Sequence, residues 1–200
     1  MRKPLVGLQF LIIVFSFIYA PQVCGGTPLE AVRTKVDGVL NVLRDPSLKN
    51  ESAEEIKKKR LWSIIDELFD YSELSRRTLG KNWAKLNLEQ QKEFSDLFST
   101  HLGNVYIDRI LAYSDEKVVF DKERRKKKRA LVYSRVVMRS KEIPIDYRMI
   151  QKNGQWKVYD VVIEGVSLVK NYRSQFREML RKKNPEYLLE TLRKKVGDKV

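Results

Sequence analysis

Residues 156–180, WKVYDVVIEGVSLVKNYRSQFREML, change their hydrophobic period halfway along the segment. The first part, Trp156 to Ile163, is typical of a strand. Gly165 then breaks the strand, and Ser167 is a residue type that caps helices. Beyond the cap, apolar residues recur at helical spacing at Leu168, Val169, Tyr172, Phe176, Met179 and Leu180. A strand followed at once by an amphipathic helix indicates a domain that mixes both kinds of element.

Three more segments upstream show the period of two that is expected of strands. They are Val118 to Phe120, Leu131 to Met138 and Ile143 to Ile150. Lys152-Asn153-Gly154 predicts a hairpin turn before Trp156, because Asn-Gly readily adopts positive φ. Four strands joined by short turns predict a twisted antiparallel meander.

The remaining segments repeat their apolar residues at helical spacing. Thr27-Pro28-Leu29-Glu30 is a capping box with proline at the first helical position, and Ser52-Ala53-Glu54-Glu55 predicts a second start of the same kind. Further helices are expected over 70–79 with Gly80 as C-terminal cap, over 87–113, and from Asn184 onward. The chain shows no internal repeat and no low-complexity linker, so we predict one α+β domain over residues 26–200.

The strands carry more apolar residues than a sheet with one solvated face requires. In the second strand, Val132, Val136 and Met138 alternate with Leu131, Tyr133 and Val137, and in the fourth, Val158 and Val162 alternate with Tyr159, Val161 and Ile163. Two interpretations remain open. Helices pack on both faces, or one face and the helix over 87–113 line an apolar cavity for a ligand. The residues predicted to line it are Phe98, Leu102, Val105, Val137, Ile145, Tyr147, Val158 and Val161.

The first 25 residues have the layout of a secretory signal peptide. Arg2 and Lys3 precede an apolar stretch from Leu5 to Ala20, and small residues follow at Gly25 and Gly26. The stretch is short for a membrane span of about 20 residues, although a retained anchor is the alternative. We therefore predict a signal peptide over 1–25 and export of the remainder, with Cys24 incidental or removed.

The charge is strongly basic, with 40 Lys and Arg against 26 Asp and Glu, a formal net charge of +14. Such an excess attracts an anionic partner, and export argues against nucleic acid. Six cations in a row, Arg124, Arg125, Lys126, Lys127, Lys128 and Arg129, fall between the first two strands and predict an exposed hairpin tip. This tip is either a solvated loop or a docking patch for lipid headgroups or an acidic partner protein.

The sequence contains no complete catalytic or metal-binding motif. One Cys and one His, His101, cannot supply the four ligands of a structural zinc site, so we expect no metal. Gly165-Val166-Ser167 lacks the second glycine of a nucleophile elbow, and no glycine-rich phosphate loop occurs. We expect no catalytic residue and no cofactor. An isomerase that uses Asp160 and Glu164 in a pocket is the enzymatic alternative.

The segment from Trp156 to Leu180 resembles the signature of the MlaC family, also called the toluene-tolerance auxiliary family. Phe69-Asp70-Tyr71 with Leu79-Gly80-Lys81-Asn82-Trp83 is similar to a second stretch of that family. The helix from Gln91 through Tyr106 is similar to a third. The resemblance spans about Pro28 to Arg193. The six-residue basic run is a departure, because the family is not uniformly this basic.

The resemblance implies a non-enzymatic, soluble periplasmic carrier of phospholipid, with a twisted sheet and helices enclosing an apolar pocket. It further implies lipid exchange with an inner-membrane ABC transporter that bears an MCE-domain protein, and with an outer-membrane lipoprotein complex. A monomer with transient membrane contact is expected. The alternative within the same class is an extracytoplasmic binding protein for another hydrophobic ligand, such as a hopanoid or isoprenoid.

Overall fold

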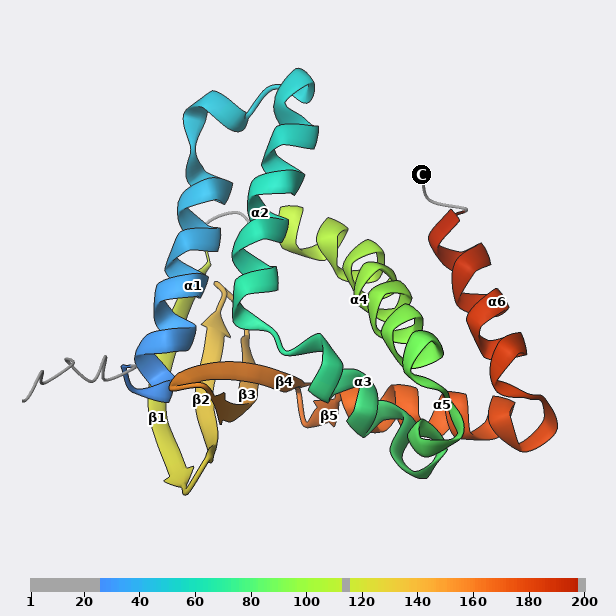
Figure 1. Ribbon diagram of the computed structural model, residues 1–200. Coiled ribbons are helices and arrows are strands. Elements are labelled where there is room, and N and C mark those ends of the chain that lie inside the picture. The colour runs from blue at the N-terminus through green and yellow to red at the C-terminus, as the bar shows by residue number, and fades with distance from the viewer. Residues whose placement is uncertain (1–25, 113–115, 198–200) are drawn as a thin grey trace, which may run out of the picture.

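The computed structural model describes residues 26–112 and 116–197, so the predicted signal peptide lies outside the described residues. Within these ranges the chain forms six α-helices, three short 3₁₀ helices and one sheet (Figure 1). The α-helices are α1 (Pro28–Arg44), α2 (Glu54–Leu68), α3 (Tyr71–Leu79), α4 (Leu88–Leu111), α5 (Leu168–Lys182) and α6 (Pro185–Gly197). The 3₁₀ helices are η1 (Pro46–Leu48), η2 (Glu51–Ala53) and η3 (Gly80–Lys85).

Side chains cap most of these helices where the sequence predicts it. Thr27 and Glu30 form a complete capping box on α1, and the Ser167 hydroxyl accepts a hydrogen bond from the Lys170 amide at the start of α5. The capping box predicted at Ser52 is wrong. The chain there forms the turn η2 first, and α2 begins at Glu54 behind Ala53, which has no capping side chain.

The sheet is antiparallel in the order β1-β2-β3-β4-β5. Its strands are β1 (Lys117–Lys126), β2 (Arg129–Val137), β3 (Glu142–Lys152), β4 (Gln155–Ile163) and β5 (Val166–Ser167). The prediction of four strands is therefore wrong by one. Glu164 and Gly165 have φ angles of 49° and 81°, and these turn the chain back so that Val166 pairs with Ile163.

The basic run is more ordered than a long loop. β1 continues to Lys126, where it pairs with Arg129, so only Lys127 and Lys128 form the turn. Lys127 has a φ of 53°, as two-residue hairpin turns require. The backbone carbonyl of Lys128 also accepts a hydrogen bond of 2.9 Å from the Gln151 amide of β3. The predicted hairpin between the first two strands is present, and its turn is two residues long.

A break in the register of β4 decides which side chains face the helices. Asp160 pairs with Arg148 and Val158 pairs with the next residue, Met149, so Tyr159 has no partner in β3. Because of this extra residue, Val158 and Val161 lie on the same face of the sheet. Simple alternation had placed them on opposite faces, and the bulge is the reason that this prediction is wrong.

Helices cover the face of the sheet that carries Val132 and Val158, which we call the inner face. Val32 of α1 and Leu68 of α2 belong to one buried cluster with those two residues. A second cluster joins α3, α4, α5 and α6 beside the sheet, around Phe94 and Phe98. The long helix α4 connects the two parts, because Ile107 near its end packs with Leu40 and Leu61 of α1 and α2 (Figure 1).

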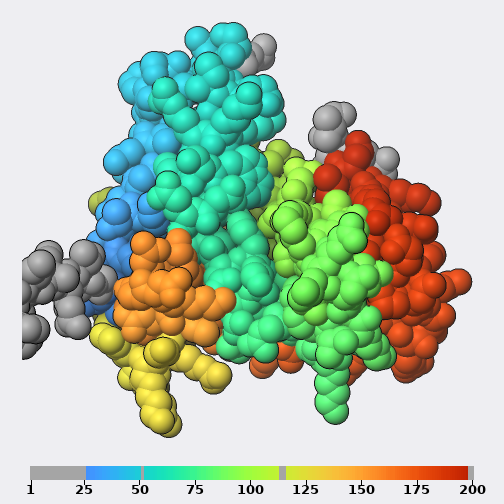
Figure 2. Space-filling view, viewed as in Figure 1, coloured from blue at the N-terminus to red at the C-terminus, as the bar shows by residue number. Residues whose placement is uncertain are grey.

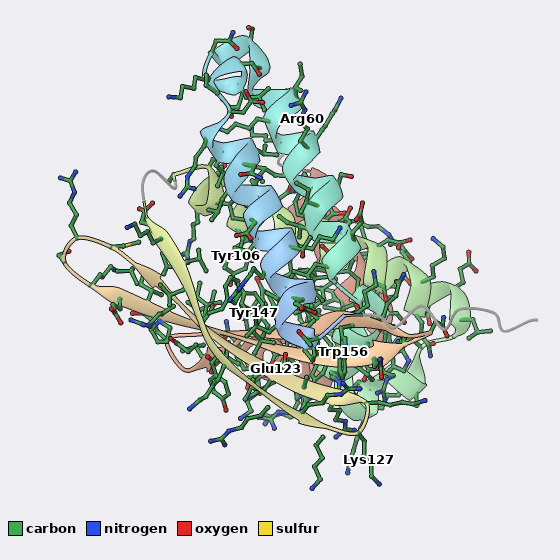
Figure 3. The ribbon with its side chains drawn as sticks, turned by 90° about the vertical axis from the view of Figure 1, so that its left-hand side faces the viewer. Arg60, Tyr106, Glu123, Lys127, Tyr147 and Trp156 are labelled. Carbon is green, nitrogen blue, oxygen red and sulfur yellow. The ribbon has the colours of Figure 1, made fainter. Side chains whose placement is uncertain are left out.

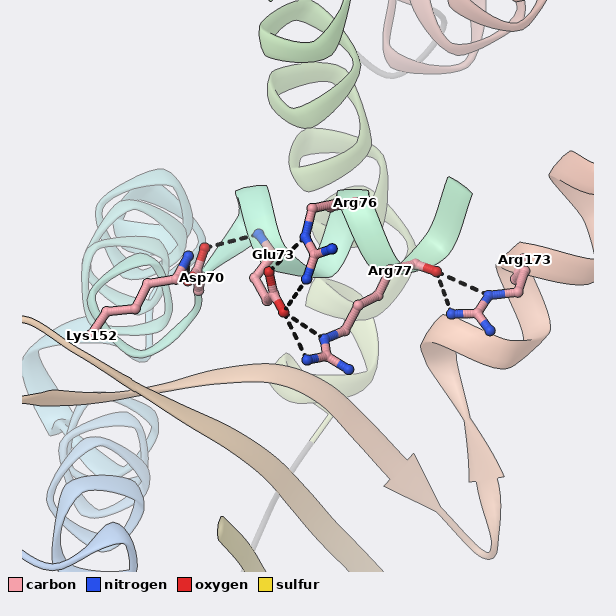
Figure 4. A network of polar contacts seen from close by, with 6 residues as sticks. All are labelled: Asp70, Glu73, Arg76, Arg77, Lys152 and Arg173. Atoms are coloured by element: carbon pink, nitrogen blue, oxygen red, sulfur yellow. Dashed lines mark hydrogen bonds and ion pairs between the residues drawn. The ribbon is translucent and has the colours of Figure 1, made fainter. Parts of the chain in front are cut away.

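A polar network holds α3 between the sheet and α5 (Figure 4). The Asp70 amide donates to the Val158 carbonyl at 2.8 Å, and the Asp70 carboxylate pairs with Lys152 at 2.5 Å. Buried Glu73 accepts hydrogen bonds from Arg76 and Arg77. Burial by itself raises the pKa of Glu73, but the two guanidinium groups outweigh it and the pKa lies below its usual value. Glu73 is therefore held as a carboxylate.

Helices α2 and α4 meet where Trp62 lies against Gly103. A Cβ at position 103 would fall 1.6 Å from Cη2 of the Trp62 ring, so only glycine permits this approach. The indole occupies the space that any side chain on α4 would need. This contact joins the helix pair over the sheet to the helical cluster beside it.

We expect Gly103→Ala to lower the free energy of unfolding by about 1–3 kcal/mol, because the methyl group forces the indole out of its place. Gly38→Ala is the matched control on α1. Its Cβ would meet Ile64 at an ordinary 3.5 Å, so it should stabilise the helix by about 0.5–1 kcal/mol. Urea unfolding of both variants measures the difference. Equal effects at the two positions would show that the Trp62 contact is not tight.

Candidate functional site

The inner face of the sheet is mostly apolar, and the helices bury it unevenly. Toward the β1–β2 turn, Val132, Met149 and Val158 are fully buried under α1 and α2. Toward the opposite end the side chains are only partly buried. These are Phe120, Val136, Ile143, Ile145, Tyr147 and Ile163. We call this set the half-covered end of the inner face.

The second half of α4 approaches the half-covered end from the helical side. Ile107, Ile110 and Leu111 pack in one cluster with Val118 at the start of β1. Val105 and Tyr106, one turn earlier on α4, are partly buried. Figure 3 places Tyr147 on the helix side of the sheet and Lys127 at the far end of the hairpin. The end of α4 thus packs against the start of β1, beside a sheet face whose apolar side chains are not completely buried. Partly buried apolar residues of this kind are typical of a site for an apolar ligand.

The structure brings together half of the predicted pocket residues. Val158 and Val161 are buried in the inner-face cluster, and Ile145 and Tyr147 pack against it. Phe98 and Leu102 belong instead to the cluster of α3, α5 and α6, and Val105 is partly buried on α4. Val137 pairs with Glu142 and alternates with inward-facing Val136, so it lies on the outer face.

The hydroxyl of Tyr147 lies in an environment that disfavours its charged form. Burial raises the pKa of Tyr147 to about 12, and a hydrogen bond with Ser134 lowers it by less. Ser134 is itself buried, and its hydroxyl donates to the Ile145 carbonyl at 2.7 Å. The surroundings of the Tyr147 hydroxyl therefore favour the neutral phenol over the phenolate.

Sequence patterns did not single out Tyr172, which pairs with His101 inside the helical cluster. Both residues are buried, and the Tyr172 hydroxyl lies 3.4 Å from Nε2 of His101. The rings stand at 90° with centroids 5.8 Å apart. His101 packs against an aromatic ring of another helix, and this contact accounts for its burial.

Asp160 is fully occupied by structural contacts. Its carboxylate accepts hydrogen bonds from the Ser167 hydroxyl at 2.7 Å, the Val169 amide at 3.0 Å and Arg148 at 2.8 Å. The side chain of Asp160 is 2% exposed. Glu164 lies apart in the exposed β4–β5 turn. Asp160 therefore anchors the start of α5 to β4, and the two carboxylates do not form the pair that the isomerase alternative needs.

Two cavities of about 410 Å³ open at the surface away from the inner face. The first lies between the η1–η2 segment and the end of α4, and the second lies at the corner of α5 and α6. Neither is lined by a predicted pocket residue. Among residues 26–112 and 116–197, no cluster of three His, Cys, Asp or Glu is placed to hold a metal ion. None of the helices in those ranges has the length and hydropathy to cross a membrane.

Comparison with known proteins agrees with this architecture. The family model described as MlaC protein matches residues 33–194. The toluene tolerance protein ttg2D of Pseudomonas putida is 24% identical over 88% of this chain and 82% of its own length. The intermembrane phospholipid transport system binding protein MlaC of Haemophilus influenzae is 25% identical over 56% of each chain.

A solved structure shares the fold. It is the phospholipid-binding protein of Ralstonia solanacearum, determined in complex with a phospholipid. The two chains superpose with a TM-score of 0.75 at 23% sequence identity, covering 86% of this chain and 98% of the other. The arrangement of sheet and helices described above is therefore one that an experimental structure also shows.

We expect Asp160→Asn to destabilise the fold by about 3 kcal/mol, because it leaves the Arg148 guanidinium without its buried partner and weakens the anchor of α5. Glu164→Gln is the control, since Glu164 is exposed, and it should change stability by less than about 0.5 kcal/mol. Chemical unfolding followed by circular dichroism gives both values. A small loss for Asp160→Asn would contradict the anchoring role.

The raised pKa of Tyr147 predicts a loss of stability in alkali. The unfolded chain releases this proton near pH 10 and the folded chain only near pH 12, so the contribution is complete below pH 10 and is lost as pH rises to about 12. Unfolding in urea at about pH 9 and pH 11 should show a smaller alkaline loss for Tyr147→Phe than for the unaltered protein. Tyr172 has a similarly raised pKa, so part of the loss should persist. Identical losses in both proteins would exclude Tyr147 as a source.

Proposed function

Because the chain belongs to the MlaC family, we propose that it is a phospholipid carrier that holds acyl tails against the half-covered end of the inner face. The observation that carries this proposal is the incomplete burial of six apolar side chains, Ile145 and Tyr147 among them, on a sheet that is otherwise dry. The phospholipid bound to the Ralstonia protein, which has the same fold, supports the choice of ligand.

The physical need for such a surface follows from the cost of exposing tails to water. Each methylene removed from water contributes about 0.8 kcal/mol, so two tails of about 16 carbons would cost over 20 kcal/mol in solution. A carrier must offset most of that cost with an apolar lining. The chemistry of binding requires no nucleophile, metal or cofactor from the protein, which agrees with the structural role of Asp160.

Tails reach the half-covered end, in this proposal, when α4 and the sheet move apart. The helical cluster is tied to the sheet through α3 and α5, which both contact β4, and through the packing of α4 against α1 and α2. The Trp62–Gly103 contact lies on that second connection. A ligand that fills the space between sheet and α4 would replace side-chain contacts with tail contacts, so opening and loading are coupled.

The carrier acts in the periplasm, delivered there by the signal peptide over residues 1–25. Its exchange partners are an inner-membrane ABC transporter complex with an MCE-domain protein and an outer-membrane lipoprotein complex. The name of the Haemophilus relative, which describes intermembrane phospholipid transport, supports movement of lipid between two membranes.

Native mass spectrometry of the gently purified protein tests the ligand directly. We expect adducts of phospholipid mass, and extraction into organic solvent should identify headgroup and tails. Recovery of a hopanoid or isoprenoid would overturn phospholipid as the cargo. A protein that is free of lipid and takes up none from labelled vesicles would overturn the carrier function.

Added bulk at the half-covered end should displace lipid. We expect Ile145→Trp to lose most of the bound phospholipid, because Ile145 is partly buried on the inner face. Val137→Trp is the matched control on the outer face of the same sheet, and it should keep the lipid load of the unaltered protein. Circular dichroism confirms that both variants are folded. Full lipid occupancy in a folded Ile145→Trp protein would place the tails elsewhere.

A further inference from the structure

The β1–β2 hairpin carries a concentrated positive charge away from the half-covered end of the inner face. All six residues of the basic run 124–129 are exposed, and the hairpin projects from the body of the protein (Figure 2). The β3–β4 turn lies at the same end of the sheet, because Arg129 pairs with Ile150. We call the run Arg124 to Arg129 the basic tip.

The charges of the basic tip are not neutralised by the protein. None of its six cations makes an ion pair with another side chain of the described residues. Glu123, which directly precedes the run in the sequence, faces inward and accepts a 2.7 Å hydrogen bond from the Leu29 amide of α1. Adjacent like charges repel, so fold stability does not account for them.

The tip holds its charges on a rigid support. Backbone pairing continues to Lys126 and Arg129, and the third strand binds the turn through Lys128. Arg125 lies over the Trp156 ring at 5.1 Å on the inner side, and Arg124 lies over the Tyr133 ring at 5.9 Å on the outer side. Cations therefore point to both faces of the hairpin and beyond its end.

We propose that the basic tip docks the protein on the surface of an anionic phospholipid bilayer. A bilayer presents negative charge over a plane without a defined shape, which suits cations that spread from both faces of a hairpin. The exposed large apolar residues among those described are Ile56, Leu88, Val166 and Tyr187, none of them on the tip. The contact is therefore electrostatic and reversible.

This proposal rests on the proposed function, since a carrier that loads and unloads lipid must reach a membrane and leave it again. The tip and the half-covered end are different parts of the sheet. Arg129 at the tip pairs with Ile150, whereas Ile145 lies five residues before Ile150 on β3. The charge that holds the protein at a surface is thus separate from the apolar face that holds the tails.

The test compares two quadruple variants with the same change in net charge. Lys126, Lys127, Lys128 and Arg129 are replaced by Gln in the tip variant, which keeps Arg125 on Trp156. The control replaces exposed Lys81, Lys85, Lys194 and Lys195 by Gln. The protein expressed from the full sequence is purified and sedimented with vesicles. One set of vesicles contains phosphatidylcholine alone, and the other contains phosphatidylcholine and phosphatidylglycerol. Melting temperature and bound lipid are measured in parallel.

We expect binding only to the vesicles that contain phosphatidylglycerol. The tip variant should lose roughly 600-fold in partitioning, since each of the four lost cations contributes about fivefold near an anionic surface. The control should lose far less. Raising salt from about 0.1 M to 1 M shortens the screening length from about 10 Å to 3 Å and should abolish the difference. Melting temperature and lipid content should be unchanged in both variants.

Equal losses in the two variants would overturn the proposal, because net charge alone would then explain the binding. Binding of the tip variant at full strength would overturn it as well, and would leave an acidic protein as the partner to seek. Loss of bound lipid in the tip variant would place these cations at a headgroup site rather than a docking surface. An absence of lipid in the unaltered protein concerns the proposed function alone, because vesicle binding is measured separately.

Discussion

Tyr159 has no partner in β3, and this one extra residue decides which side chains of β4 face the helices and which face away. Val158 and Val161 both turn to the inner face, where they complete the apolar lining. Asp160 turns away and gathers Arg148, Ser167 and the start of α5 around its carboxylate. Without the bulge, strict alternation would carry a charge inward or a valine outward. The helical cluster is attached to the sheet at this point, so its position depends on the same irregularity.

Helix α4 then decides how tightly the inner face is covered. Its first half is buried among α3, α5 and α6, and its second half packs with α1, α2 and the start of β1. A helix that serves two clusters is apolar around much of its circumference. It can also couple them, because movement at one end is transmitted through a rigid element to the other. In the proposed carrier this coupling would open the half-covered end without dismantling either cluster.

Buried and exposed charges of the protein differ in whether they have a partner. Buried Glu73 pairs with two arginines of its own helix α3, and buried Asp160 of β4 pairs with Arg148 of β3. Asp160 also binds the start of α5. The cations of the basic tip have no such partner in the described chain and remain at the surface. The buried carboxylates therefore hold neighbouring elements in place, whereas the exposed cations of the basic tip are available to bind an anionic surface.

The sequence by itself determined the kinds and order of the elements, since periodicity, capping residues and the Asn153-Gly154 turn act locally. It also identified the family that the comparison confirms. Only the tertiary structure decided which apolar residues meet. It turned Val137 outward, moved Val161 inward, added β5 and divided the apolar residues of α4 between two clusters. Bulges and long-range packing depend on the partner strand and helix, so no local pattern in the chain records them.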